Sequence, residues 1–117
     1  MSGSPPAPQK LVVMIVTQHD GERLMQALVR GGFPATRTGS SGGFLRRGSV
    51  TIFSGVPTDG VDAVLELVRR TCPVRTEMAP VQTLPIAGAA TASGPPLEVR
   101  TGGAVVFVLD VERFERI

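Results

Sequence analysis

The chain is a small protein of globular, weakly basic composition. It has 117 residues, of which 42% are hydrophobic and 19% charged, with a formal net charge of +2, as expected of one domain with an ordinary core. The one cysteine and one histidine exclude an intramolecular disulfide and a cysteine-rich zinc cage, and so small a net charge gives no reason to expect a nucleic-acid partner.

The N-terminal stretch is small, polar and rich in proline. We therefore predict a disordered tail over residues 1–9 and one domain over residues 10–117. The tail has no basic region followed by an apolar stretch, as a signal peptide would have. The longest apolar run, Leu11 to Val16, is far shorter than the roughly 20 residues that a membrane helix needs. These features predict a cytoplasmic protein with no membrane partner.

The domain begins with a strand and a helix. Leu11 to Val16 is apolar without alternation, which predicts a central strand buried on both faces. Apolar residues at helical spacing, among them Leu24 and Leu28, then predict a helix. We expect Asp20 to be its N-cap and Gly31-Gly32 to end it.

Further strands flank a glycine-rich loop. Phe33 to Thr38 is predicted to be extended, and Pro34 places this segment at a sheet edge. Gly39 to Gly43 is predicted to be a flexible loop. It is followed by a short strand at Phe44 to Arg47 and a stronger one at Val50 to Val56.

The second half returns to a helix followed by extended segments. Apolar residues from Val61 to Val68 predict a helix that ends near Arg69-Arg70, where cations favour the helix dipole. Cys72 to Met78 can be extended, and Ala79 to Pro96 is predicted to be a long loop. The apolar runs on either side of Gly102-Gly103 predict either a hairpin or one strand with a glycine bulge.

Together these elements predict an α+β fold with long loops, a ferredoxin-like sandwich of β-α-β-β-α-β order. Such a sheet carries its two helices on one face. The strands at Leu11 to Val16 and Val50 to Val56 are apolar on their other face as well. We expect an oligomer, because a second subunit would cover that face.

The loop from Thr38 to Gly43 is the sharpest candidate site. Gly42-Gly43 can let backbone N–H groups converge on an anion, and two serines add hydroxyl donors. Arg37 before the loop and Arg46-Arg47 after it add positive charge. It is not a Walker A loop, because no Lys-Ser/Thr follows it. Phosphate binding and a plain connector with solvated arginines both remain open.

The other reactive residue types are better explained without catalysis. His19 is predicted to be an exposed polar residue in a turn, and Cys72 a small buried hydrophobe. Asp59 and Asp62 are typical of charges at a helix N-terminus rather than of an acid–base pair. Because no nucleophile with an acid–base pair can be assembled, we expect neither an enzyme nor a metal or other cofactor.

Three blocks of sequence carry a resemblance to a known family. The segments Gly32 to Thr36, Ser41 to Thr51 and Gly102 to Val108 resemble the signature of the cyclic-di-AMP receptor family of PII-like signalling proteins. The similarity covers about residues 10–117, with the order of the elements preserved. It implies a PII-like homotrimer without catalysis that binds one cyclic dinucleotide at each subunit interface. It also implies that long loops rearrange on binding and that an unidentified protein partner lies downstream.

The resemblance also implies roles for single residues. Thr36 would hydrogen-bond near an adenine or a phosphate, Gly55 would let the ligand approach closely, and Phe107 would pack on a base. The rest of the implied pocket lies in the glycine-rich segment and the residues that follow it: Gly42, Gly43, Phe44, Leu45 and Ser49.

The chain departs from the family signature at a few positions. Family members that bind the nucleotide usually have Asn, Arg and Asn in place of Gly32, Pro34 and Ser49. Asparagine offers a donor and an acceptor to a base edge, whereas proline lacks both charge and N–H. We therefore predict weak or absent binding of cyclic di-AMP, unless Arg37 or Arg116 supplies compensating charge.

Two functional hypotheses result from the sequence. The first is a signalling protein that senses a nucleotide, with cyclic di-AMP as the leading ligand. The alternative is a trimeric interaction module that has lost cyclic di-AMP binding and senses another metabolite or none.

Overall fold

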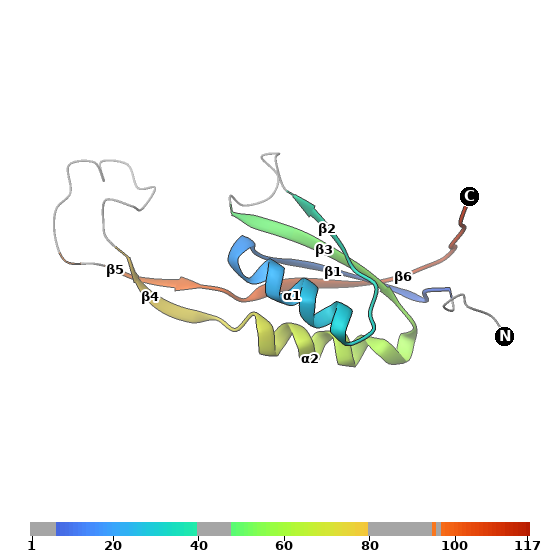
Figure 1. Ribbon diagram of the computed structural model, residues 1–117, viewed down its shortest axis with the longest axis horizontal. Helices are drawn as coiled ribbons and strands as arrows, with labels where there is room; N and C mark the ends of the chain where they lie inside the picture. Colours follow the sequence, from blue (N-terminus) through green and yellow to red (C-terminus); the bar gives the residue numbers. More distant parts are fainter. Residues whose placement is uncertain (1–6, 40–47, 80–94, 96) are drawn as a thin grey trace.

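Six strands and two α-helices make up the described part of the chain. The computed structural model describes residues 7–39, 48–79, 95 and 97–117 (Figure 1). The predicted strand Phe44 to Arg47 and most of the predicted loop Ala79 to Pro96 lie outside these residues. In chain order the elements are β1 (Lys10–Thr17), α1 (Gln18–Arg30), β2 (Thr36–Gly39), β3 (Ser49–Val56), the 3₁₀ turn η1 (Thr58–Gly60), α2 (Val61–Thr71), β4 (Arg75–Ala79), β5 (Leu97–Thr101) and β6 (Ala104–Asp110).

Four of the strands form one antiparallel sheet in the order β2-β3-β1-β6. The sheet places β1 at its centre and β2 at an edge, as the sequence predicts for both. Helices α1 and α2 pack side by side against one face of this sheet (Figure 1). The element order and the sheet order confirm the predicted α+β, ferredoxin-like fold, with β6 as its last strand.

The core lies between the two helices and the side of the sheet that faces them. In β1 every second residue from Val12 to Val16 is buried, and the residues between them are only partly buried, as the pleat of a strand requires. The prediction that β1 is buried on both faces is therefore wrong for the single chain, because both helices lie on the same side. The core residues are Val12, Met14, Val16, Leu24, Leu28, Val50, Ile52, Val56, Val64, Val68 and Cys72.

Helix α1 begins earlier than the sequence predicts. Its N-cap is Thr17, whose Oγ1 accepts a hydrogen bond from the backbone N–H of Asp20 at 3.1 Å. The prediction of Asp20 as N-cap is wrong, because its carboxylate is buried in the first turn and paired with two arginines. The end of the helix is as predicted: Gly31 is the C-cap, and Gly32 has a φ of 84°.

Strands β4 and β5 form a separate two-stranded sheet, here called the arm, which extends away from the four-stranded sheet (Figure 1). Strand β5 pairs with β4 and not with β6, so the predicted hairpin is wrong. The chain runs from β5 into β6 through Gly102 and Gly103, whose φ angles are 86° and 78°. This is closer to the alternative of one strand interrupted by glycines. A Cβ at these positions would press on Pro73 or Val74, so both require glycine.

Candidate functional site

The face of the four-stranded sheet opposite the helices, here called the open face, is apolar. On β6 the side chains of Val105, Phe107 and Leu109 are 55%, 51% and 48% exposed. Apolar and aromatic side chains exposed together on a sheet are typical of a surface that binds a ligand or a second subunit. One row across all four strands consists of Thr36, Phe53, Val13 and Phe107.

Four of the predicted site residues lie on this open face. Thr36 and Phe107 belong to the row just described. Ser49 and Gly55 lie on β3 at even spacing from Phe53, which places them on the same side of the strand. The sheet therefore brings together residues that are far apart in the sequence.

The remaining predicted residues lie elsewhere. Arg37 is on the helix side of β2, because its register partner is the core residue Ile52. It is exposed there and points away from the four predicted residues on the open face. Arg116 follows β6 in the C-terminal segment. Four predicted residues fall outside the described residues: Gly42, Gly43, Phe44 and Leu45.

A cavity of about 440 Å³ opens beside the end of β3. It brings Gly55 together with Arg116, and it also includes Gly32 and Pro34, two of the positions that depart from the family signature. Ser54 Oγ donates a hydrogen bond to the carbonyl oxygen of Pro34 at 2.6 Å, which fixes this wall against β3. The other lining residues are Pro8, Phe33, Val56, Pro57 and Phe114.

Sequence reasoning missed the apolar walls of this cavity. Pro8 falls in the predicted tail, yet Gln9 beside it is hydrogen-bonded to Val56 and Val111, one residue ahead of the predicted domain start at Lys10. Phe114 follows the last strand and has no periodic pattern around it. A large aromatic residue in an otherwise polar terminal segment is a signal that could have marked it.

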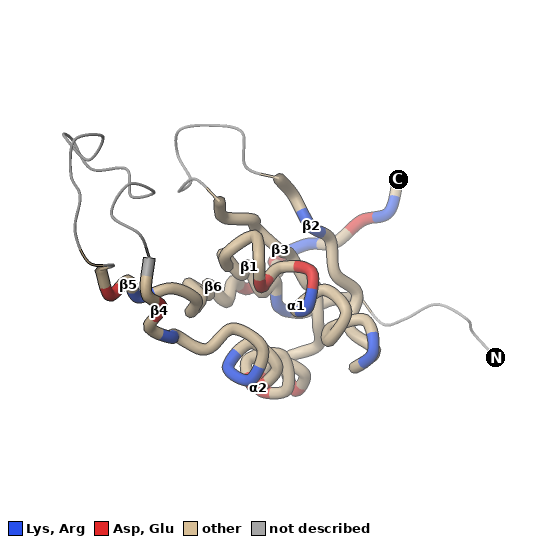
Figure 2. The backbone as a smooth tube through the Cα atoms, turned by 60° about the vertical axis from the view of Figure 1, so that its left-hand side comes forward, with Lys and Arg blue, Asp and Glu red and all other residues tan. Residues whose placement is uncertain are grey.

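The charged residues do not gather into one basic surface in the described part of the chain. Lys10 lies on β1, and the described arginines lie on α1, α2, β2, the arm and the C-terminal segment, with acidic residues among them (Figure 2). Among the described residues no group of histidine, cysteine and acidic side chains could hold a metal ion. Within the same residues, no helix has the length and apolar character needed to cross a membrane.

One charged cluster is buried, at the junction of the arm and the helices. Asp20 is fully buried and is bonded by Arg23 of α1 and by Arg75 of β4, the latter at 3.3 and 3.4 Å. Burial raises the pKa of Asp20, but the hydrogen bonds from Arg23 and Arg75 outweigh it and hold the pKa below its usual value. Arg23 also donates to the carbonyl oxygen of Thr71 at 3.3 Å. These contacts tie the arm to both helices, a structural role.

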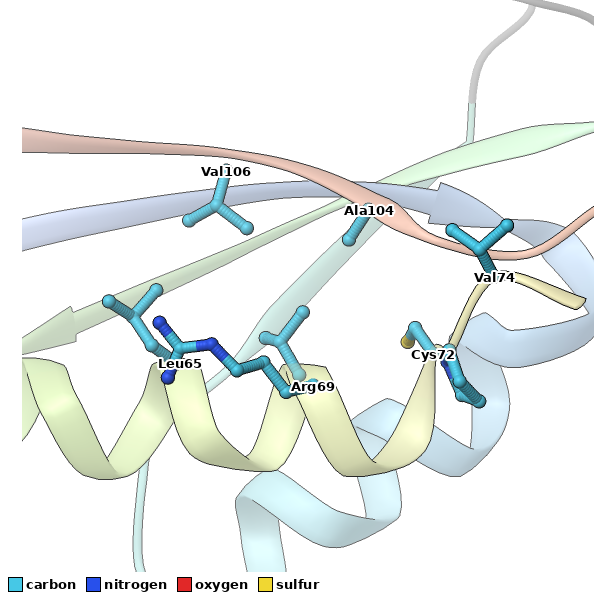
Figure 3. Close-up of a pocket in the computed structure, with 8 residues that line it drawn as sticks. Leu65, Arg69, Cys72, Val74, Ala104 and Val106 are labelled. Carbon is cyan, nitrogen blue, oxygen red and sulfur yellow. The ribbon is translucent and has the colours of Figure 1, made fainter.

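A second cavity, of about 400 Å³, lies between α2 and β6 on the helix side of the sheet. Leu65 and Arg69 on α2 face Ala104 and Val106 on β6 across it (Figure 3). Of the predicted site residues that the structure describes, none lines it. Cys72 lies at one end, and burial raises its thiol pKa to about 11, so the thiol is protonated and unreactive at neutral pH. This confirms Cys72 as a buried hydrophobe.

The fold and the open face define a class: a small α+β sandwich whose sheet presents an apolar surface opposite its helices. The chain matches the family model described as Cyclic-di-AMP receptor over residues 9–117. Because the match spans nearly the whole chain, the protein belongs to this family. The resemblance identified in the sequence is thereby confirmed.

A solved structure is similar to this chain over its whole length. It is described as the crystal structure of a functionally unknown protein from Pediococcus pentosaceus ATCC 25745. The two sequences are 30% identical, and the match covers 96% of this chain and 100% of the other, with a TM-score of 0.71. The likeness supports the same small α+β fold for both proteins.

Proposed function

We propose that this protein is a non-enzymatic, PII-like signalling protein that binds cyclic di-AMP between the subunits of a cytoplasmic homotrimer. Membership of the family over residues 9–117 supports the ligand class. One observation carries the proposal: Thr36, Gly55 and Phe107, which match the family's binding set, share the open face with Ser49, which stands where binding members usually have Asn. The bound state would then be recognised by a downstream protein partner.

The open face offers the contacts that a cyclic dinucleotide needs. The half-exposed ring of Phe107 can stack on an adenine. The hydroxyls of Thr36 and Ser49 can hydrogen-bond to a base edge or a phosphate oxygen. Gly55 has no side chain to keep a ligand away from β3, and Arg116 in the adjoining cavity can pair with a phosphate.

A second subunit would complete this site. In the described part of the chain the side chains of Val105, Phe107 and Leu109 remain about half exposed. Burying apolar surface contributes about 25 cal/mol per Å², so covering the open face favours association. A symmetric trimer would bury this face in each subunit and form one ligand site at each interface.

The cavity beside β3 favours a second candidate function. Gly32 and Pro34 present neither a side-chain donor nor a charge to it. With these contacts missing, the chain could serve as a trimeric interaction module that senses another metabolite or none. The identity of the ligand distinguishes the two functions.

Thermal denaturation with a panel of nucleotides tests the proposal. At a concentration high enough to fill a weak site, we expect cyclic di-AMP to raise Tm more than cyclic di-GMP, ATP, ADP or AMP at equal concentration, because a ligand that binds only the folded state stabilises it by mass action. Phe107→Leu should abolish this rise, and Val108→Ala, on the opposite side of β6, should retain it. A larger rise with ATP, ADP or AMP, or none with any ligand, would favour the alternative.

A further inference from the structure

The chain's own Pro8 lies directly against Gly55. A Cβ placed on Gly55 would be 2.9 Å from Cβ of Pro8 and 3.3 Å from its Cγ. The open side of this glycine is therefore not empty space. It is filled by a residue that precedes β1.

Gln9 holds Pro8 in this place. The backbone N–H of Gln9 donates to the carbonyl oxygen of Val56 at 3.0 Å, and its own carbonyl oxygen accepts from the N–H of Val111 at 3.0 Å. Its side-chain Oε1 accepts from the backbone N–H of Thr58 at 2.8 Å. The residue next to Pro8 is thus bonded to the segments on both sides of β1.

Pro8 also forms part of the cavity of about 440 Å³ that contains Gly55 and Arg116. A proline ring loses little entropy when it is fixed, because its φ is already restricted. It can therefore occupy such a site at low cost. Any ligand that contacts the backbone at Gly55 competes with this ring for the same space.

We propose that Pro8, tethered by Gln9, is a built-in competitor of the nucleotide at this site. The inference rests on the proposed function, because it assumes that cyclic di-AMP approaches Gly55. The binding-competent state is then the one in which the Pro8 ring has moved away from Gly55. The apparent Kd equals the Kd of that state divided by the fraction of molecules that occupy it. Pro8 therefore sets the ligand concentration at which the protein responds.

Calorimetric titration with cyclic di-AMP tests the proposal on the full chain and three variants. Pro8→Gly removes the competing ring and should bind about tenfold tighter than the native chain. Gln9→Ala removes the bond to Thr58 and should tighten binding to a smaller extent. Ala7→Gly makes a similar backbone change at an exposed neighbour and should match the native chain.

The outcomes separate this inference from the proposed function. Equal binding by Pro8→Gly and the native chain would overturn the proposal that Pro8 competes with the ligand, and it would leave the proposed function in place. Weaker binding by Pro8→Gly would also overturn it, since Pro8 would then be a ligand contact. If neither the native chain nor any variant binds cyclic di-AMP although all have native circular dichroism spectra, the proposed function is wrong. The proposal that Pro8 competes with the ligand is then wrong as well.

Discussion

Replacing Asp20 by asparagine should destabilise the protein at neutral pH by about 2 kcal/mol. Removing one partner of a buried ion pair costs about 3–5 kcal/mol, because the other charge is left uncompensated. The cost is smaller here, since the Arg23 side chain is 56% exposed and returns to water. The amide of asparagine also keeps one oxygen that can accept a hydrogen bond. The main loss is the charge that holds Arg75 of the arm.

The loss should depend on pH in a direction set by the pKa of Asp20. That pKa is lowered in the folded state from its usual 3.8, because hydrogen bonds from Arg23 and Arg75 outweigh the effect of burial. A carboxyl group of this kind contributes stability above its unfolded pKa and loses it as pH falls through its folded pKa. The difference between the native chain and Asp20→Asn should therefore be complete at pH 7 and shrink below about pH 4.

Urea unfolding at pH 7, 5 and 3, at one fixed subunit concentration, measures this difference. Glu22→Gln removes an exposed carboxylate from the same helix turn and serves as the control; it should change the free energy of unfolding by less than about 0.5 kcal/mol. A loss below about 0.5 kcal/mol for Asp20→Asn at pH 7, or the same loss at all three pH values, would refute the reasoning.

Three further predictions concern the oligomeric state, the positions that depart from the family signature, and the glycines between β5 and β6. Light scattering at micromolar concentration should show a trimer; a monomer would contradict a ligand site between subunits. Pro34→Arg with Ser49→Asn should tighten cyclic di-AMP binding in calorimetry by about ten- to a hundredfold; no gain would mean that the cavity differs from the family's in shape. Gly102→Ala should lower Tm more than Gly48→Ala, since both have left-handed φ but only Gly102 packs against Pro73; equal losses would contradict this.

Local sequence patterns correctly predicted the central strand β1 and the first helix. The continuous apolar run in β1 and the helical spacing of Leu24 and Leu28 depend only on neighbours in the sequence, so they could be interpreted without a structure. The N-cap could not be settled in this way. Thr17 and Asp20 are both good capping residues, and the choice depends on Arg75, which lies far along the chain.

The arm and the cavity depend on long-range pairing, which the sequence does not encode locally. Gly102-Gly103 between two apolar runs is a good turn signal, but β5 pairs with β4 and β6 with β1. Of the site, Thr36 and Phe107 came from the family resemblance, and only the sheet register shows them in one row. Pro8 was missed because composition alone assigned it to a tail.

A crystal structure of the protein grown with saturating cyclic di-AMP tests the central claim most directly. We predict a trimer with the ligand between two subunits, in contact with Ser49, Gly55 and Phe107 on the open face and with Arg116 beside it. It also predicts that Pro8 has moved away from Gly55. A ligand in the cavity between α2 and β6, or an open face buried by a subunit with no ligand there, would contradict the proposed ligand site.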